Sequence, residues 1–124
     1  MKIYLSHSRN IDYKKELYVP IKSSEIINKH EFIFPHENSD QLYPTRELLQ
    51  NKGCDLIIAE VSFPATGQGI ELGWASMLDI PIVCIYKDGA KPANSLNEVT
   101  SKFLMYTSPE NMIEDITGVL KQYE

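Results

Sequence analysis

The chain has 124 residues and carries 17 acidic against 12 basic side chains, a formal net charge of −5. An acidic chain without a run of Lys or Arg gains nothing from a polyanionic partner, so we expect no binding to nucleic acid or to an anionic membrane. The length suits one domain, residues 1–124. No apolar run approaches the roughly 20 residues that a membrane-spanning helix needs.

Cysteine and histidine are sparse and irregularly spaced. Cys54 and Cys84 form no CxxC or Cys/His pattern, so we expect two reduced, structural thiols. The segment 1–6 turns polar too early for a signal peptide, and we expect a cytoplasmic protein. His7, His30 and His36 lack the spacing of a metal site, so no metal or other cofactor is expected.

The first part of the chain alternates apolar runs with a helical pattern. Residues 2–6 are predicted to form a strand, and residues 31–35 a short second one. Between them, residues 12–29 show helical spacing of their apolar side chains. Pro20 lies inside this pattern and should kink or restart the helix.

The middle of the chain contains the clearest buried strands. Thr45 could cap a helix over 46–52. The most apolar strand is predicted over 55–61, a helix over 69–78, and the next buried strand over 81–86.

The last part of the chain ends in a helix with clear start signals. A short helix is expected over 95–100 and a final strand over 102–106. Ser108 is expected to cap a helix over 109–123 whose first position is Pro109.

Five strands separated by helices predict an α/β fold. We expect a single doubly wound, mainly parallel five-stranded sheet with helices on both faces, Rossmann-like or flavodoxin-like. The nearly continuous apolar runs at 56–59 and 82–85 fit its central positions. With the strand order 2-1-3-4-5, the loops after the first and third strands would flank the topological switch point, where ligands bind.

The most informative stretch is Val61-Ser-Phe-Pro-Ala-Thr-Gly-Gln-Gly-Ile-Glu-Leu-Gly-Trp-Ala75. It places Glu71 behind a glycine-rich loop that could approach a ligand closely. We expect Glu71 in the first turn of the following helix, where the helix dipole favours the ionised carboxylate. Such a carboxylate can orient hydroxyl groups or attack an electrophilic carbon. The alternative is an acid that only stabilises the start of the helix.

Residues 55–75 resemble the core motif of the nucleoside 2-deoxyribosyltransferase family, and more closely its 2'-deoxynucleoside 5'-phosphate N-hydrolase branch. The shared features are a strand ending in Ala-Glu-Val, a Pro-x-x-Gly-x-Gly loop and Glu-Leu-Gly. Residues 2–9 resemble the family's first strand and phosphate-facing loop. The resemblance implies an N-glycosidase that acts on a small-molecule nucleoside or its 5'-monophosphate as a homodimer. Hydrolysis is preferred because the chain is short, and a deoxyribosyltransferase stays the alternative.

The resemblance also assigns the catalytic residues. Glu71 aligns with the glutamate that attacks C1' of the sugar and releases the base. Glu47, 24 residues earlier, stands where the family usually has an aspartate that protonates the leaving base or orients the sugar. His36 is an alternative acid for the base.

Further positions are expected to bind substrate. Arg9 falls near the family's 5'-phosphate, and Ser95 matches a serine that reaches the phosphate site of the neighbouring subunit. Ala65 replaces the family's loop serine, so Thr66 could substitute as a donor, and the need for a 5'-phosphate stays open. The substrate-binding candidates are Tyr4, His7, Arg9, His36, Thr66, Gly67, Gly69 and Ser95.

Other interpretations remain open at this point. The chain could be a nucleotide-binding or signalling module without turnover. Residues 3–8 also resemble the first strand of TIR domains, which would imply a TIR-like NAD hydrolase. Glu60 either orients Glu71 or the loop, or is a surface acid, and Trp74 is expected in the core or in a dimer contact.

Overall fold

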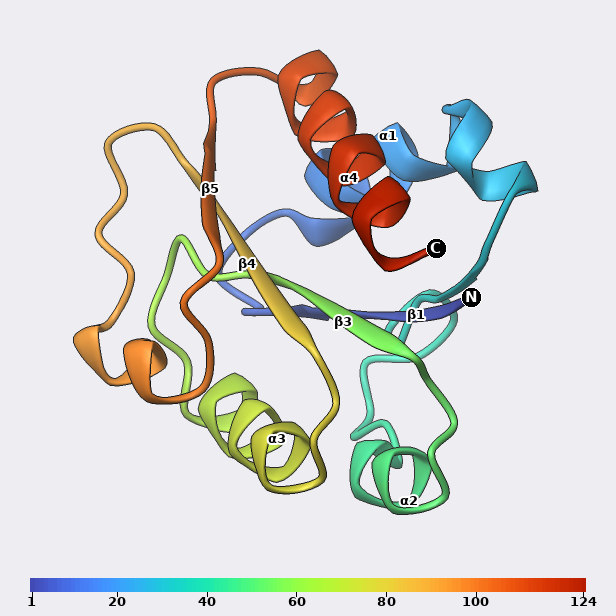
Figure 1. The fold of residues 1–124 in the computed structure, drawn as a ribbon. Coiled ribbons are helices and arrows are strands. Elements are labelled where there is room, and N and C mark those ends of the chain that lie inside the picture. Colours follow the sequence, from blue (N-terminus) through green and yellow to red (C-terminus); the bar gives the residue numbers. More distant parts are fainter.

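The computed structural model describes all 124 residues, and helices alternate with strands along the chain (Figure 1). The elements are β1 (Lys2–His7), the π-helix η1 (Lys14–Tyr18), α1 (Val19–Lys22), the 3-10 helix η2 (Glu25–Asn28), β2 (Glu31–Ile33), α2 (Thr45–Gln50), β3 (Leu56–Glu60), α3 (Thr66–Met77), β4 (Ile82–Lys87), the 3-10 helix η3 (Asn94–Glu98), β5 (Phe103–Tyr106) and α4 (Pro109–Tyr123).

The five strands form one parallel sheet in the order β2-β1-β3-β4-β5. This confirms the predicted doubly wound α/β fold and its strand order. His7 at the end of β1 pairs with Glu60 at the end of β3, so both strands finish at the same edge. The direction of winding reverses between these two strands, and this edge is therefore the topological switch point.

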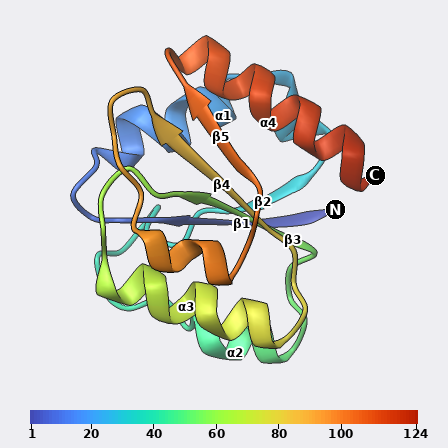
Figure 2. The same ribbon diagram turned by 60° about the vertical axis from the view of Figure 1, so that its left-hand side comes forward.

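Helices cover both faces of the sheet. α1 and α4 lie on one face, and α2 and α3 lie on the other (Figures 1 and 2). Because side chains alternate across a strand, Leu56 and Ile58 of β3 join the core beneath α1 and α4, whereas Ile57 and Ala59 join the core against α2 and α3. A central strand buried on both faces is apolar along most of its length, here from Leu56 to Ala59, which is why the sequence predicted it well.

The helical pattern over residues 12–29 does not form one helix. It is divided into η1, α1 and η2, which follow one another between β1 and β2. Pro20 lies in the first turn of α1. It lacks an N–H group, which a first turn does not need, and so restarts the helix as predicted.

The expected glycine-rich loop is in fact the beginning of α3. The helix starts at Thr66 instead of Gly69, so Gly67 lies in its first turn. Glycine is less favourable than alanine in a helix by roughly 1 kcal/mol. The first turn is fastened to the sheet by Gln68, whose Nε2 donates to the Glu60 carbonyl at 2.9 Å.

The two expected caps have different outcomes. Thr45 is the first residue of α2, and no side chain caps this helix. The Thr45 hydroxyl instead lies 2.9 Å from the hydroxyl of Tyr4. Ser108 does cap α4, because its Oγ accepts from the Asn111 N–H at 3.0 Å and Pro109 occupies the first turn.

Both cysteines are free and buried. Burial raises the pKa of the Cys54 thiol to about 11 and that of Cys84 to about 12. The two thiols therefore stay protonated at neutral pH and serve packing.

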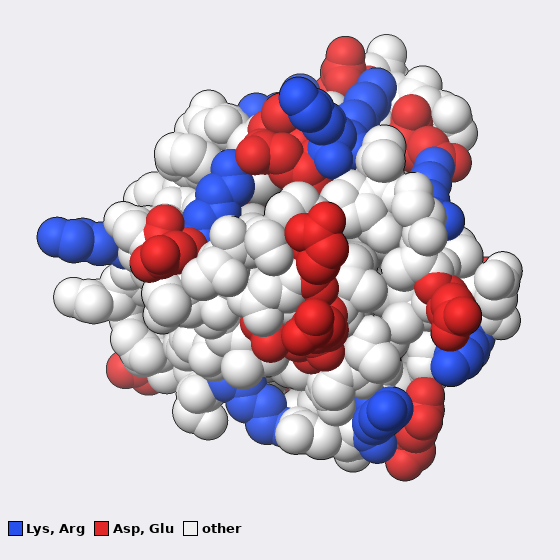
Figure 3. Space-filling view, turned by 90° about the horizontal axis from the view of Figure 1, so that it is seen from above, with Lys and Arg blue, Asp and Glu red and all other residues white.

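The surface carries mixed charges. Figure 3 shows the molecule from above the view of Figure 1. On this face, Lys and Arg are interspersed with Asp and Glu. None of the helices combines the length and the apolar character that crossing a membrane requires.

Candidate active site

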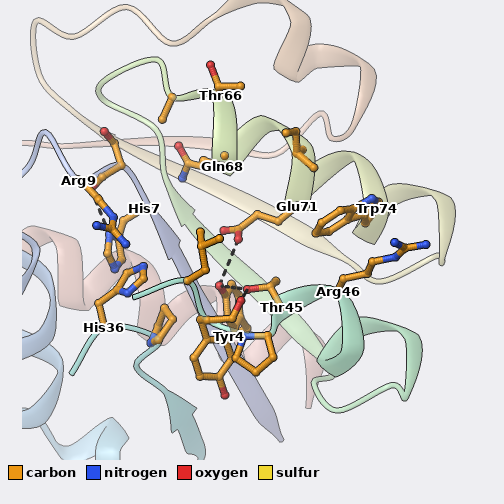
Figure 4. A pocket seen from close by; sticks show the side chains of 18 of the residues that line it. Tyr4, His7, Arg9, His36, Thr45, Arg46, Thr66, Gln68, Glu71 and Trp74 are labelled. Atoms are coloured by element: carbon orange, nitrogen blue, oxygen red, sulfur yellow. Dashed lines mark hydrogen bonds between the residues drawn. The ribbon is translucent and has the colours of Figure 1, made fainter. Parts of the chain in front are cut away.

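A cleft of about 660 Å³ opens where β1 and β3 end, between α2 and the beginning of α3 (Figure 4). Its volume is in the range of small-molecule sites, about 300–1,000 Å³. Seven of the ten residues predicted for the site line this cleft: Tyr4, His7, Arg9, His36, Thr66, Gly67 and Glu71.

Glu71 reaches into the middle of the cleft from α3. Ser6 Oγ donates to its Oε1 at 2.6 Å, and the Tyr4 hydroxyl donates to its Oε2 at 3.3 Å. Both donors belong to β1 and are two residues apart, so they lie on the same face of the strand. The carboxylate is thus held by hydroxyl groups and by no cationic side chain.

The ionisation of Glu71 is set by burial. Burial raises the pKa of Glu71, and hydrogen bonds from Ser6, Tyr4 and Thr45 offset part of the rise. The prediction that the helix dipole favours the ionised form was wrong. α3 begins at Thr66, so Glu71 lies in the second turn, beyond the reach of the dipole.

His7 presents a neutral ring to the cleft. Its Nδ1 lies 3.1 Å from the Ser8 carbonyl, which can only accept, so Nδ1 carries the proton. Its Nε2 then accepts from the Tyr18 hydroxyl at 2.6 Å. Burial lowers the pKa of His7 to about 4. With both nitrogens occupied, His7 is unsuited to donate a proton to a leaving group at neutral pH.

His36 lies beside His7, with ring centroids 5.6 Å apart. Its backbone N–H donates to the Tyr18 hydroxyl at 3.1 Å, which fixes the end of β2 against the same cluster. Its Nδ1 lies 3.3 Å from the Ser39 carbonyl. The Nε2 atom has no protein partner and remains available to a ligand in the cleft.

Arg9 and the start of α3 form one end of the cleft. Figure 4 shows Arg9 and Thr66 on the same side of Glu71, with Trp74 and Arg46 on the other side. Arg9 Nη2 donates to the Asp40 carbonyl, which leaves its other N–H groups free. No side chain caps α3, and a Cβ at Gly67 would meet nothing within 4 Å. Backbone N–H groups at this end are therefore open to a ligand.

Three predicted residues do not reach the cleft. Glu47 is exposed on α2 and does not line it, whereas its neighbour Arg46 does. Gly69 and Ser95 line an adjacent hollow of about 380 Å³, which shares Thr66 with the cleft. The structure thus removes Glu47 from the neighbourhood of Glu71, and Ser95 does not enter the cleft of its own subunit.

Sequence reasoning missed the hydroxyl groups that hold Glu71. Ser6 interrupts an apolar strand two positions after Tyr4, and that position was a usable signal. Thr45 was interpreted as a helix cap, and no local pattern distinguishes the two roles. Trp74 was expected in the core or in a dimer contact; it is not in the core but lies at the margin of the cleft with 37% of its surface exposed, and the dimer contact stays a prediction.

Glu60 is a buried structural acid instead of a surface acid. Its carboxylate accepts from the Ser62 N–H at 2.7 Å, from Ser62 Oγ at 2.9 Å and from the Tyr106 hydroxyl. Its backbone carbonyl accepts from Gln68. Glu60 therefore fixes the turn from β3 to α3 and holds the helix that carries Glu71, which agrees with its expected role at the loop.

The fold and the cleft define a flavodoxin-like α/β protein with a half-buried carboxylate at its switch-point cleft. No family model matches the chain. In sequence it is similar to the 5-hydroxymethyl-dUMP N-hydrolase of Mus musculus, with 40% identity over 48 residues, or 39% of this chain and 28% of that enzyme. The matched part is thus little more than a quarter of the mouse enzyme.

In structure the chain is similar to the CMP N-glycosidase BcmB of Clostridium botulinum. The TM-score is 0.63 and the identity 19%, over 94% of this chain and 99% of the other. At this identity the likeness establishes the shared fold. Both similar proteins bear names of enzymes that cleave N-glycosidic bonds, in agreement with the resemblance of residues 55–75.

Proposed function

We propose that this chain is an N-glycosidase that hydrolyses the base–sugar bond of a nucleoside or its 5'-monophosphate, with Glu71 as the nucleophile. The observation that carries the proposal is the carboxylate of Glu71 in the middle of a 660 Å³ cleft, held by two hydroxyl groups of β1. The names of the two similar enzymes support the same reaction class.

The reaction would follow the two-step retaining scheme of glycoside hydrolysis. In the first step a Glu71 oxygen forms a bond to C1', the C1'–N bond breaks, and its electron pair and a proton go to the base. In the second step water attacks C1', the bond to Glu71 breaks, and the surplus proton of the water is released. The carboxylate is then restored.

His36 is our candidate for the group that protonates the leaving base. Its free Nε2 faces the cleft, whereas both ring nitrogens of His7 are engaged. Glu47 lies outside the cleft and is not retained for this role. General acid catalysis of this kind contributes about 10²–10⁴-fold in rate.

The 5' group of the substrate would lie at the end of the cleft formed by Arg9, Thr66 and Gly67. The guanidinium of Arg9 supplies positive charge, and the first turn of α3 supplies unpaired N–H groups. Together they suit a 5'-phosphate, for which a charge-assisted pair with arginine is strong.

We also propose a homodimer built on the exposed apolar face of α3, at the margin of the cleft that Ile70 and Trp74 line. Ile70, Trp74 and Met77 follow one another at helical spacing and are 49%, 37% and 86% exposed. An apolar stripe of this kind fits a self-complementary two-fold contact. Ser95 and Thr66 line the same 380 Å³ hollow next to the cleft, and the family resemblance makes Ser95 of the partner subunit the expected second contribution to the 5' site. Size-exclusion chromatography with light scattering tests this, because Met77→Lys should yield monomers.

Two further proposals concern the setting of the reaction. The net charge of −5 supports a monomeric nucleotide instead of a nucleic acid polymer as substrate. The two free, buried thiols support a reducing compartment, the cytoplasm.

The decisive assay incubates the protein with deoxynucleosides, ribonucleosides, their 5'-monophosphates and NAD, and follows the free base by chromatography. Base release that is lost in Glu71→Gln supports the proposal. Glu114→Gln is the matched control, because Glu114 is an exposed acid on α4. A thermal shift with nucleotides but no release would instead establish a nucleotide-binding module, and cleavage of NAD alone a TIR-like hydrolase.

A further inference from the structure

The strand that leads into the cleft carries a serine whose hydroxyl has one partner, the glutamate in the middle of the cleft. Ser6 is 0% exposed, so water cannot satisfy its hydroxyl. Its Oγ donates to Glu71 Oε1 at 2.6 Å and makes no other hydrogen bond. A buried serine hydroxyl is unfavourable unless it is paired in this way.

The two oxygens of Glu71 are held unequally. Oε1 receives the 2.6 Å bond from Ser6, within the short range of hydrogen bonds to ionised acceptors. Oε2 receives the 3.3 Å bond from Tyr4, which is long for an O–H donor. The Tyr4 hydroxyl is also shared with Thr45 at 2.9 Å, so its bond to Oε2 is the weaker of the two.

We propose that Ser6 is a positioning residue that anchors Oε1 and leaves Oε2 as the atom that attacks the sugar. This inference rests on the proposed function. In the attack, Oε2 forms the bond to C1' and the base nitrogen takes the electron pair of the breaking bond. Oε1 becomes the carbonyl oxygen of the glycosyl ester, to which Ser6 can still donate.

The same hydrogen bond has a consequence for ionisation that is separate from packing. A bond to the carboxylate favours its charged form and opposes the effect of burial. Tyr4 is the titratable group that contacts Glu71 directly. The other charged or titratable groups that line the cleft are unchanged when Ser6 is replaced: His7, Arg9, His36, Tyr43 and Arg46.

A direct test measures the titration of Glu71 by NMR in protein with ¹³C-labelled glutamate, with Glu71→Gln to assign the signal. In Ser6→Ala the titration midpoint should rise by about one pH unit or more, since a charge-assisted hydrogen bond is lost. Ser24→Ala is the matched control, because Ser24 Oγ donates a bond of similar length, 2.7 Å, to the Ile21 carbonyl, away from the cleft. It should leave the midpoint unchanged.

The pH dependence of kcat/KM gives a second readout. The acid limb of the profile should move to higher pH in Ser6→Ala and stay near the native position in Ser6→Thr, which keeps the hydroxyl. If Ser6→Thr does not fold, Ser6→Cys keeps the volume with a weak donor and should behave like Ser6→Ala.

An unchanged Glu71 titration in Ser6→Ala overturns the inference. If the titration moves but the native protein releases no base from any substrate, the proposed function fails while the ionisation role of Ser6 stands. If base release depends on Glu71 but the acid limb does not move, the proposed function stands and Ser6 has no part in it.

Discussion

Replacing Glu71 by glutamine should change activity and stability in opposite directions. Glutamine has nearly the same shape, its oxygen can accept from Ser6, and its amide can donate to the Tyr4 hydroxyl. It cannot form the glycosyl ester that the proposed mechanism requires. The variant should therefore keep the fold, lose at least about 10³-fold in kcat, and become more stable at neutral pH.

The sign of the stability change follows from the ionisation of Glu71. Burial raises the pKa of Glu71 above its ordinary value of 4.5, so folding favours the protonated form. The native protein is free of this penalty below pH 4.5 and acquires it as the pH rises through the folded-state pKa. Each pKa unit of such a rise corresponds to about 1.4 kcal/mol, so Glu71→Gln is expected to be more stable than the native protein at pH 7.

Thermal unfolding of both proteins at pH 4 and pH 7 measures this effect. For a chain of this length, 1 kcal/mol corresponds to about 3–5 °C in Tm. The variant should melt higher at pH 7, and most of the difference should vanish at pH 4. A variant that is less stable than the native protein at pH 7 would show that burial does not dominate the energetics of this carboxylate.

Other side chains of the fold and cleft give separate predictions. Arg9→Ala should raise KM for 5'-monophosphates about tenfold or more and leave KM for unphosphorylated nucleosides unchanged; an equal rise for both would place the phosphate elsewhere. His36→Gln should lower kcat by about 10²-fold, whereas Glu47→Gln should change kcat by less than about threefold. Steady-state kinetics of the two variants measure this difference. A larger loss in Glu47→Gln than in His36→Gln would make Glu47 the acid. Glu60→Gln should lower the free energy of unfolding, measured by urea denaturation, by about 1–3 kcal/mol. The reason is that the amide group replaces one of the two acceptor oxygens of Glu60 by a donor. An unchanged denaturation midpoint would mean that the turn after β3 is held by other contacts.

The features predicted correctly from sequence are those with a local or periodic cause. The apolar runs 56–59 and 82–85 identified β3 and β4 as central strands, since a strand buried on both faces is nearly continuously apolar. Ser108 and Pro109 marked the start of α4, because a cap and a first-turn proline act within one helical turn. The alternation of helices and strands predicted a parallel sheet, and the common order 2-1-3-4-5, taken as an assumption, is the order observed.

The features predicted wrongly depend on residues far apart in sequence. The glycines at 67 and 69 suggested a loop, but Gln68 fastens this segment to the end of β3 and the helix forms regardless. Threonine is a residue type that often caps helices, but the Thr45 hydroxyl is paired with the hydroxyl of Tyr4, 41 positions earlier. Helix propensity depends on the local sequence and does not reflect contacts between residues that are far apart in the chain.

The candidate site was also predicted only in part from the sequence: Glu71 lies in the cleft as expected, whereas Glu47 does not. The motif around Glu71 identified the carboxylate of the cleft because the strand, turn and helix that place it are contiguous. The spacing of 24 residues selected Glu47 but does not fix which side chains of α2 line the cleft, and the structure brings Thr45 and Arg46 there. Ser6 was passed over because its partner lies 65 positions later in the chain.

A covalent trap tests the central claim most directly. A substrate analogue with fluorine at C2' of the sugar slows both steps of a retaining reaction and lets the glycosyl ester accumulate. After proteolysis, mass spectrometry should find the added sugar on the peptide that contains Glu71, at the glutamate itself. Base release from the natural substrate with the sugar attached to another residue, or with no attachment at all, would contradict Glu71 as the nucleophile.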